Sequence, residues 1–350
     1  MAITPEMLRL VERLRNGIIR QERAVAVQLR REYGKVYRAL RQQALDVRKQ
    51  IKAAEAAGQV ISPWRMHRLE RLQSLQRQAL AESYRFADMA AGLITDAERE
   101  ALLAGQRDGY ELLLSALPDD AGVLVPWDRL PVPAIDAMVG VLADGSPLSR
   151  LLQEALGDAA QGFMDQLVAG LAAGWNPRKL ARVLRDEYGM GLTRALRISR
   201  TEILRAYRTA TLLEYRQSRM VLGWERHATQ DSRTCMACIM LDGTRYTTEQ
   251  AMDDHVNGRC AMLPITPSWR DLGFDIDEPD FDRQLAQDWF LEQPDAVQRG
   301  MLGPGKYDAW RAGLFGLDDL PKLRRDPVWG DSWVPKSLRE LTAVAERMAA

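Results

Sequence analysis

The stretch LRNGIIRQERAVAVQLRREYGKVYRALRQQALDVRKQI, residues 14–51, decides the largest element of the fold. Apolar side chains recur in it every eleven residues. They form two rows, Leu14, Val25, Val36 and Val47 in the first and Ile18, Leu29, Leu40 and Ile51 in the second. Eleven residues in three turns give about 3.67 residues per turn, close to the period of a straight α-helix. We therefore expect one long, nearly straight helix over residues 5–57.

The segment AAGQVISP, residues 56–63, separates this helix from a second one. Gly58 suits the cap that ends a helix, while Ser62 and Pro63 suit the start of the next. We expect the second helix over residues 64–94. The two helices then fold back on each other as a long hairpin.

A third helix is expected over residues 96–117, because Thr95 followed by Glu98 has the spacing of a capping box. Residues 118–148 contain several prolines and glycines. They predict a connector with one short helix near residues 134–142.

The next part of the chain predicts a compact bundle of helices over residues 149–173, 177–188 and 193–219. After Gly223 the pattern changes to turn residues and short apolar runs, which indicate short strands. The tail after residue 271 predicts amphipathic helices anchored by scattered tryptophans.

The expected fold class is mainly α with a small α+β module that contains the cysteines. We divide the chain into four parts. These are a long helical hairpin or arm at 1–117, a connector at 118–148, a domain with the candidate zinc site at 149–267, and an acidic, then mixed, helical tail at 268–350.

Charge is distributed unevenly although the net charge is zero. Residues 1–80 hold 17 Lys and Arg against 7 Asp and Glu, and residues 271–319 hold 4 against 12. Such blocks indicate partners of opposite charge or, alternatively, solvated helix surfaces. No apolar run approaches the ~20 residues that span a bilayer, and the N-terminal segment has no signal-peptide pattern, so neither a membrane span nor export is expected.

All three cysteines and a histidine lie within DSRTCMACIMLDGTRYTTEQAMDDHVNGRCAMLP, residues 231–264. Cys235 and Cys238 have the C-x-x-C spacing of a zinc-binding turn, and His255 and Cys260 follow. Three thiolates and one imidazole predict a tetrahedral Zn²⁺ site, structural because no position is left for water. Two alternatives remain: three buried thiols with a hydrogen-bonded histidine, or a redox C-x-x-C.

Catalytic patterns are weak in this sequence. The zinc-deaminase pattern is incomplete, and no P-loop, G-x-S-x-G or kinase motif occurs. An HNH-type nuclease is the nearest match because Asp254 and His255 stand beside the cysteines, but no histidine follows His255. We therefore expect a protein that is not an enzyme.

The ordered motifs ISRTEILRAYRTATLLEYRQS, Trp224, DSRTCMACIMLDG and HVNGRCAMLP resemble the phage Mu F-like minor head proteins, also called phage head morphogenesis proteins. The family pattern has a proline and a cysteine where this chain has Val256 and Gly258. If zinc takes four protein ligands from this window, His255 has to be one of them. The matching residues are Arg200, Thr201, Glu202, Trp224, Asp231, Arg233, Cys235, Cys238, Leu241, Asp242, Gly243, His255, Asn257, Arg259, Cys260 and Pro264.

Several of these residues receive structural roles. Arg200 and Glu202 stand two apart on a helix and do not face each other. We expect a polar clamp across to the cysteine window, with Glu202 paired to Arg233. Arg200 would pair with Asp231 or Asp242 in the same clamp. Gly243 is expected in a turn between two strands.

The resemblance implies a structural minor head protein of a tailed phage or prophage. Its implied partners are the portal protein and capsid proteins, and packaged DNA would meet the basic N-terminal hairpin. Its implied place is the virion, in the capsid interior or at the portal vertex, after synthesis in the host cytoplasm. The alternatives are a zinc-stabilised nucleic-acid-binding protein and an HNH-like nuclease.

Overall fold

The computed structural model describes residues 3–59, 70–118, 131–142 and 145–349. Helices dominate these residues, with a few short antiparallel strands, which confirms the predicted fold class. The elements are α1 Pro5–Ala56, α2 Glu70–Leu114, α3 Val132–Met138, α4 Leu148–Ala172, α5 Pro177–Gln217, β1 Gly223–His227, α6 Met236–Met240, β2 Arg245–Tyr246, β3 Ala261–Ile265, α7 Ala286–Leu291, α8 Asp295–Leu302, α9 Pro304–Arg311, η3 Leu317–Asp319, β4 Pro321–Arg324, β5 Ser332–Pro335 and α10 Leu338–Ala349.

Two compact units divide the chain, and α1, α2 and α5 contribute residues to both. What we call the helical unit comprises Gln21–Ala97 and Gly140–Glu202. The cysteine-bearing unit comprises Met1–Arg20, Glu98–Val139 and Ile203–Ala350. Within the latter, we call residues 223–265 the cysteine module.

The eleven-residue period of α1 is visible in its burial. Ile18, Leu29, Leu40 and Ile51 are each at most 4% exposed, whereas the parallel row that begins at Leu14 is only half-buried. A further row with the same spacing is also buried and contains Val11, Glu22, Tyr33 and Ala44. One long helix with an eleven-residue apolar repeat is therefore confirmed.

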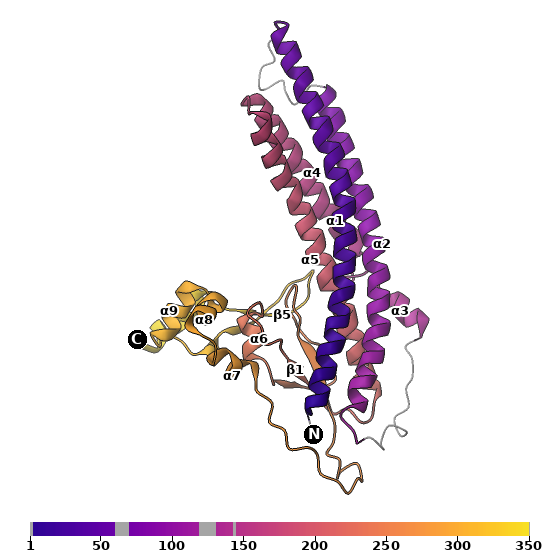
Figure 1. Ribbon diagram of the computed structural model, residues 1–350, viewed down its shortest axis with the longest axis vertical. Coiled ribbons are helices and arrows are strands. Elements are labelled where there is room, and N and C mark those ends of the chain that lie inside the picture. The colour runs from indigo at the N-terminus through magenta and orange to yellow at the C-terminus, as the bar shows by residue number, and fades with distance from the viewer. Residues whose placement is uncertain (1–2, 60–69, 119–130, 143–144, 350) are drawn as a thin grey trace. The chain divides into compact units, whose positions relative to one another are not determined.

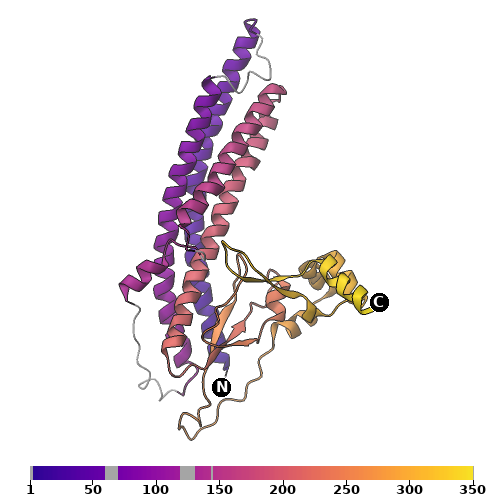
Figure 2. The ribbon, with the colours of Figure 1, turned by 180° about the vertical axis from the view of Figure 1, so that it is seen from behind.

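Parts of α1, α2, α4 and α5 run side by side in the helical unit, as both ribbon views show (Figure 1 and Figure 2). Aromatic rings join them. Tyr33 of α1 stacks on Tyr188 of α5 with ring centroids 4.6 Å apart, and Phe86 of α2 meets Tyr33 edge-on at 4.9 Å. Phe163 of α4 meets Tyr188 at 5.7 Å. Such pairs stabilise a core beyond the apolar area that they bury.

The helix break predicted between residues 188 and 193 is wrong, because α5 continues through it. A Cβ on Gly191 would lie 2.7 Å from both the Ala159 Cβ and the Tyr33 hydroxyl oxygen. Glycine stands here because helices of the unit approach closely, and not because the chain turns.

The break predicted at Thr95 is also wrong, since α2 is one helix of 45 residues. The buried face formed by Ile94, Ala97 and Ala101 continues across that position, and tertiary packing overrides the capping-box pattern. The predicted helix start at residues 62–64 and the connector residues 119–130 lie outside the described residues.

Two local predictions are confirmed. Gly58 ends α1 with a φ of 84°, and Gln59 N donates to Ala54 O at 3.0 Å, as in a Schellman cap. A short helix near residues 134–142 is present as α3.

The cysteine module contains a three-stranded antiparallel sheet in the order β2-β1-β3. Trp224 pairs with Tyr246 on one side and with Pro264 on the other. All five residues of the central strand, including Glu225, Arg226 and His227, are buried. A strand this polar and this buried needs charged partners from its neighbours.

The C-terminal elements share a core with the cysteines. Phe290 and Leu320 pack in one buried cluster with Cys238 and Cys260. The antiparallel β4–β5 hairpin was not predicted from the sequence. Among the helices of the described residues, none combines the length and apolar character that crossing a bilayer would need.

Candidate metal centre

Local structure places the two cysteines of the C-x-x-C turn. Cys235 is the N-cap of α6, and its Sγ accepts a hydrogen bond from Cys238 N at 3.4 Å. This cap directs both thiols to the same side of a single helical turn. Cys260 directly precedes β3, and its backbone is therefore fixed by the sheet.

The predicted donors are brought together. The ligand atoms of Cys235, Cys238 and His255 lie within 4.8 Å of one another, and so do those of Cys238, Asp254 and Cys260. Cys238 belongs to both groups. In a tetrahedral zinc site, sulfur atoms are about 3.8 Å apart. Each of these two groups is thus close enough to hold a metal ion.

His255 is oriented as metal-binding histidines usually are. Its Nδ1 lies 2.8 Å from the carbonyl oxygen of Val256, an arrangement that fits a ring donating from Nδ1. A hydrogen bond from one ring nitrogen to a carbonyl leaves the other nitrogen to bind metal. Nε2, which lies 4.0 Å from Asp254 Oδ1, is therefore the nitrogen available to an ion.

The closeness of the donors shifts the pKa values of Cys235 and His255 in opposite directions. The hydrogen bond with Cys238, together with contact to His255, lowers the pKa of Cys235 to about 5 against the effect of burial. Burial alone would lower the pKa of His255, but contact with Cys235 and Asp254 raises it to about 9. A metal ion would displace the protons that remain on these groups, as zinc binding requires.

Arg208 of α5 forms hydrogen bonds with the loop before β3, which contains His255 and Cys260. Its Nε donates to the carbonyl oxygen of Cys260 at 3.0 Å, and its Nη2 donates to that of Gly258 at 2.7 Å. Nη2 also lies 2.9 Å from the buried Asp254 carboxylate. A Cβ on Gly258 would lie about 2.1 Å from that carboxylate, so only glycine fits beside it.

The donor set and its surroundings fit a metal–thiolate group. Arg226 of β1 is fully buried, and among the described residues none of its three nitrogens has a hydrogen-bond partner. Cys260, Asp254 and Cys238 lie close enough for their negative charges to raise the pKa of Arg226 against the effect of burial. Thiolates held by an ion would add anionic neighbours to the Asp254 carboxylate, which lies 3.7 Å from this guanidinium without a hydrogen bond.

Asp231 and Arg233 do not have the partners that the clamp predicts, which are Arg200 for Asp231 and Glu202 for Arg233. Asp231 accepts two hydrogen bonds from Arg259, at 2.8 and 2.7 Å, and a third from Arg233 Nη2 at 2.9 Å. The hydrogen bonds with Arg259 above all hold the pKa of Asp231 far below its usual range. Asp231 thus connects the segment before Cys235 to the segment before Cys260 through its hydrogen bonds with Arg259.

Arg200 also has another partner. Its Nη2 lies 3.2 Å from Glu22 Oε2, and both residues belong to the helical unit, as does the buried Glu202. The predicted pairing of Arg200 with Asp231 or Asp242 is replaced by this contact. Sequence spacing showed that Arg200 and Glu202 do not pair with each other, but it could not identify Glu22.

Asp242 is a structural anchor inside the module. Its carboxylate accepts from Ala228 N and Ala286 N, both at 2.8 Å, and from Arg283 Nη1 at 2.8 Å. Arg283 also donates to Glu225 at 2.8 Å. One buried network therefore connects β1, the turn after α6 and the start of α7.

The turn at Gly243 joins a helix to a strand, and not two strands as predicted. Its φ of 85° lies in the region that favours glycine, and its N–H donates to Arg226 O at 2.9 Å. This turn places α6, with Cys238, beside the central strand.

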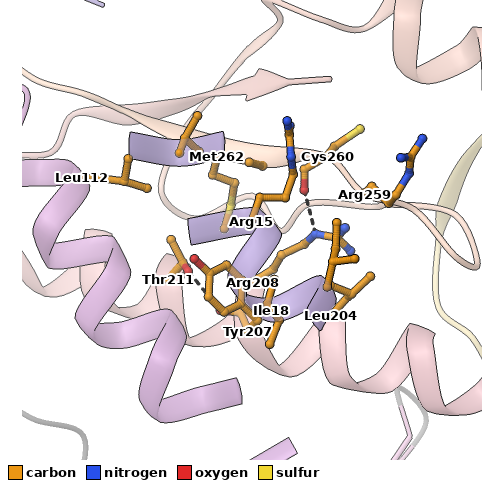
Figure 3. Close-up of a pocket in the computed structure, with 13 residues that line it drawn as sticks. Arg15, Ile18, Leu112, Leu204, Tyr207, Arg208, Thr211, Arg259, Cys260 and Met262 are labelled. Carbon is orange, nitrogen blue, oxygen red and sulfur yellow. Dashed lines mark hydrogen bonds between the residues drawn. The ribbon is translucent and has the colours of Figure 1, made fainter. Parts of the chain in front are cut away.

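Cys260 also lines a small cavity (Figure 3). It is mostly apolar, with a volume of about 20 Å³, enough for one water-sized group. Figure 3 shows the guanidinium of Arg208 turned toward the carbonyl of Cys260, with Arg15 and Arg259 nearby. Arginines therefore surround the metal-site cysteine on several sides.

Sequence reasoning missed Arg208, Arg226, Asp254 and Arg283. Arg208 and Arg226 carry no local signal, because their partners lie 28 or more positions away along the chain. Asp254 has a local signal, since it directly precedes His255, but in the sequence this pair resembles part of a nuclease motif.

Comparison with known proteins supports the resemblance drawn from the sequence. Residues 161–263 match the family model described as Phage Mu protein F like protein. That segment includes all four predicted metal ligands, and the resemblance is confirmed over it. Searches of curated proteins and of solved structures return no match.

Proposed function

We propose that the chain is a structural minor head protein of a tailed phage or prophage. It is made in the host cytoplasm, binds the portal or the inner capsid, and acts in head assembly. The match of residues 161–263 to the phage Mu F-like family carries this proposal. That family suggests a protein of phage head morphogenesis, and portal contact is our finer inference.

We infer further that Cys235, Cys238, His255 and Cys260 hold one structural Zn²⁺. Two overlapping groups of ligand atoms, Cys235 with Cys238 and His255, and Cys238 with Asp254 and Cys260, support this inference, as do the nitrogens of the buried Arg226, which are unpartnered among the described residues. Four protein ligands complete the usual tetrahedral shell of zinc and leave no position for a reactive water. The protein is therefore proposed to have a structural role and no enzymatic activity.

The arginines of α1 favour a second role, contact with packaged DNA. Exposed arginines recur along this helix at positions 9, 13, 20, 23, 30, 31, 38 and 41. Each phosphate that they neutralise would add about 0.9 to the salt dependence of duplex binding. Replacing Arg30, Arg31 and Arg38 with Gln should lower that slope by two to three, whereas the same change at Arg150 and Arg185 of other helices should leave it unchanged. An unchanged slope in the first variant would contradict the DNA contact.

The test of the main proposal is incorporation into particles. We would complement a phage or prophage that lacks this gene with the wild-type chain, and quantify the chain in purified heads by mass spectrometry. A fixed copy number in heads, and a fall in filled heads without the chain, is the expected result. Normal yields of filled heads that contain none of it would contradict the proposal.

A further inference from the structure

Arg226 stands apart from its neighbours in the central strand. Glu225 is bound by Arg283 at 2.8 Å. His227 Nδ1, 3.8 Å from Asp242, has no hydrogen-bond partner in the described part of the chain, but burial lowers the pKa of His227 to about 4, so its ring is uncharged at neutral pH. Arg226 is as deeply buried, yet all its nitrogens lack hydrogen-bond partners within the described ranges. Its closest carboxylate oxygen, Asp254 Oδ1, is 3.7 Å away. A buried charge so poorly compensated is strongly unfavourable and points to a missing anion.

Among the described carboxylates, that of Asp254 is the one within 4 Å of Arg226, and it is shared with other charged and polar groups. Asp254 Oδ2 lies 2.9 Å from Arg208 Nη2, and its Oδ1 accepts from His255 N at 3.0 Å. Of the other arginines around the site, Arg259 has Asp231 as its own partner. Arg15, also near Cys260, has one buried nitrogen without a hydrogen-bond partner among the residues described, whereas Arg226 has three, so Arg226 is the less compensated of the two.

The thiols are a further source of negative charge beside Arg226. Cys238 Sγ and Arg226 Nη1 each lie 3.7 Å from Asp254 Oδ1. The ligand atoms of Cys238, Asp254 and Cys260 lie within 4.8 Å of one another. Negative charge on these thiols would stabilise the charged form of Arg226. Three thiolates and a neutral imidazole around Zn²⁺ carry one excess negative charge. That charge is opposite in sign to the buried charge of Arg226.

We propose that Arg226 is the buried counter-charge of the metal–thiolate group and positions its sulfur ligands, an inference that rests on the proposed zinc site. Its unpartnered N–H groups donate toward the sulfurs of Cys238 and Cys260 when these are thiolates. The pairing favours the set of three thiolates over any neutral set of ligands. Loaded with metal, the group formed by the site, Arg208, Asp254 and Arg226 is neutral.

Zinc affinity tests this pairing directly. We would measure it by competition with a chromophoric chelator, under reducing conditions, for the wild type, Arg226→Met and Arg226→Lys. Loss of a residue that supports metal ligands typically weakens affinity about 10- to 100-fold, which is the loss expected for Arg226→Met. Arg226→Lys keeps the charge and should retain the larger part of the affinity. Arg245→Met is the matched control, because Arg245 is exposed and pairs with Glu225 in the same sheet.

Stability with and without metal separates this role from ordinary packing. Arg226→Met should lower the melting temperature of the zinc-loaded protein, which loses the counter-charge. It should leave unchanged or raise that of the chelated protein, whose released thiols take up protons and no longer need it. The Co²⁺-substituted variant should keep the thiolate charge-transfer bands of the wild type, because its ligands are intact.

Any other outcome of these measurements contradicts either the role of Arg226 or the zinc site. Loss of stability in both states, or an affinity equal to that of the wild type, would overturn the role of Arg226 while the zinc site stands. A wild-type chain that binds no zinc would overturn the zinc site, and with it this inference. The proposed place in the phage head is tested separately by incorporation into particles.

Discussion

The helical unit and the cysteine module are stabilised in opposite ways. In the helical unit, one apolar row of α1 repeats every eleven residues and is buried along its length, with aromatic rings between the helices. In the cysteine module, the central strand buries Glu225, Arg226 and His227 one after another. The first region depends on apolar packing, and the second on paired charges and, as we propose, on a metal ion.

The difference shows why a small module needs a metal. Its three strands have five, two and five residues, too few to bury much apolar surface. Structural zinc can supply a large share of the folding free energy in such a case. A helix of 52 residues packed in a bundle has no such need.

The largest effect is expected for Cys238→Ala. Cys238 belongs to both donor groups, so its loss should abolish zinc binding and remove a contribution on the order of 10 kcal/mol from the module. Bound zinc per chain and urea unfolding would measure this. Ile239→Val, in the same helical turn, is the control and should keep the metal while losing about 1 kcal/mol. Zinc retained at wild-type affinity by Cys238→Ala would show that Cys238 is not a metal ligand.

Leu40→Ala should produce the next largest effect, confined to apolar packing. Leu40 is 1% exposed in α1, and such truncations cost about 2–5 kcal/mol. Urea unfolding should show this loss while bound zinc stays unchanged. Val36→Ala, in the half-buried row of α1, should cost clearly less. Equal losses at the two positions would contradict the assignment of the buried row.

His227 should make the module sensitive to acid. Burial lowers the pKa of His227 to about 4, against about 6.5 in the unfolded chain, so between these values only the unfolded state binds the proton. Its contribution is complete above pH 6.5, and stability falls by about 3 kcal/mol as the pH drops to 4. Urea unfolding at several pH values should show a smaller fall for His227→Gln. Carboxylates present in both proteins contribute equally to the two pH profiles of unfolding free energy, so the difference between the profiles reports on His227. Identical profiles would refute the assignment.

A pair of glycines in α5 tests close packing in the helical unit. Gly191→Ala places a methyl group 2.7 Å from Ala159 Cβ and should cost about 1–3 kcal/mol, although alanine favours helices. Gly189→Ala meets nothing within 4 Å and should stabilise by up to about 1 kcal/mol. Thermal unfolding of both variants would measure the two signs. Stabilisation by both would mean that the helices do not approach closely at Gly191.

The sequence predicts those features that rest on local or periodic signals. The eleven-residue rows identified α1, Gly58 identified its end, and C-x-x-C with His255 and Cys260 identified side chains that come together. The prediction failed where contacts between residues far apart in the sequence determine the structure. Thr95 and Gly191 have the local chemistry of helix ends, but each lies within a continuous helix whose packing overrides it.

The charged network of the module is harder to predict for the same reason. Asp231 and Arg233 were recognised as important, but their pairing with each other and with Arg259 depends on how loops meet. Arg283 reaches Asp242 across 41 positions of sequence. Nothing within one sequence indicates such partners, because charges on short strands and loops have no period.

The most direct test of the metal-dependent module compares the two regions in one sample. We would purify the chain without chelator, measure bound zinc by mass spectrometry, and follow amide hydrogen exchange before and after chelation. The account predicts about one zinc per chain, and a rise in exchange over residues 223–265 on chelation with little change in α4. A chain that carries no zinc, or one that loses zinc with no change of exchange in the module, would contradict it.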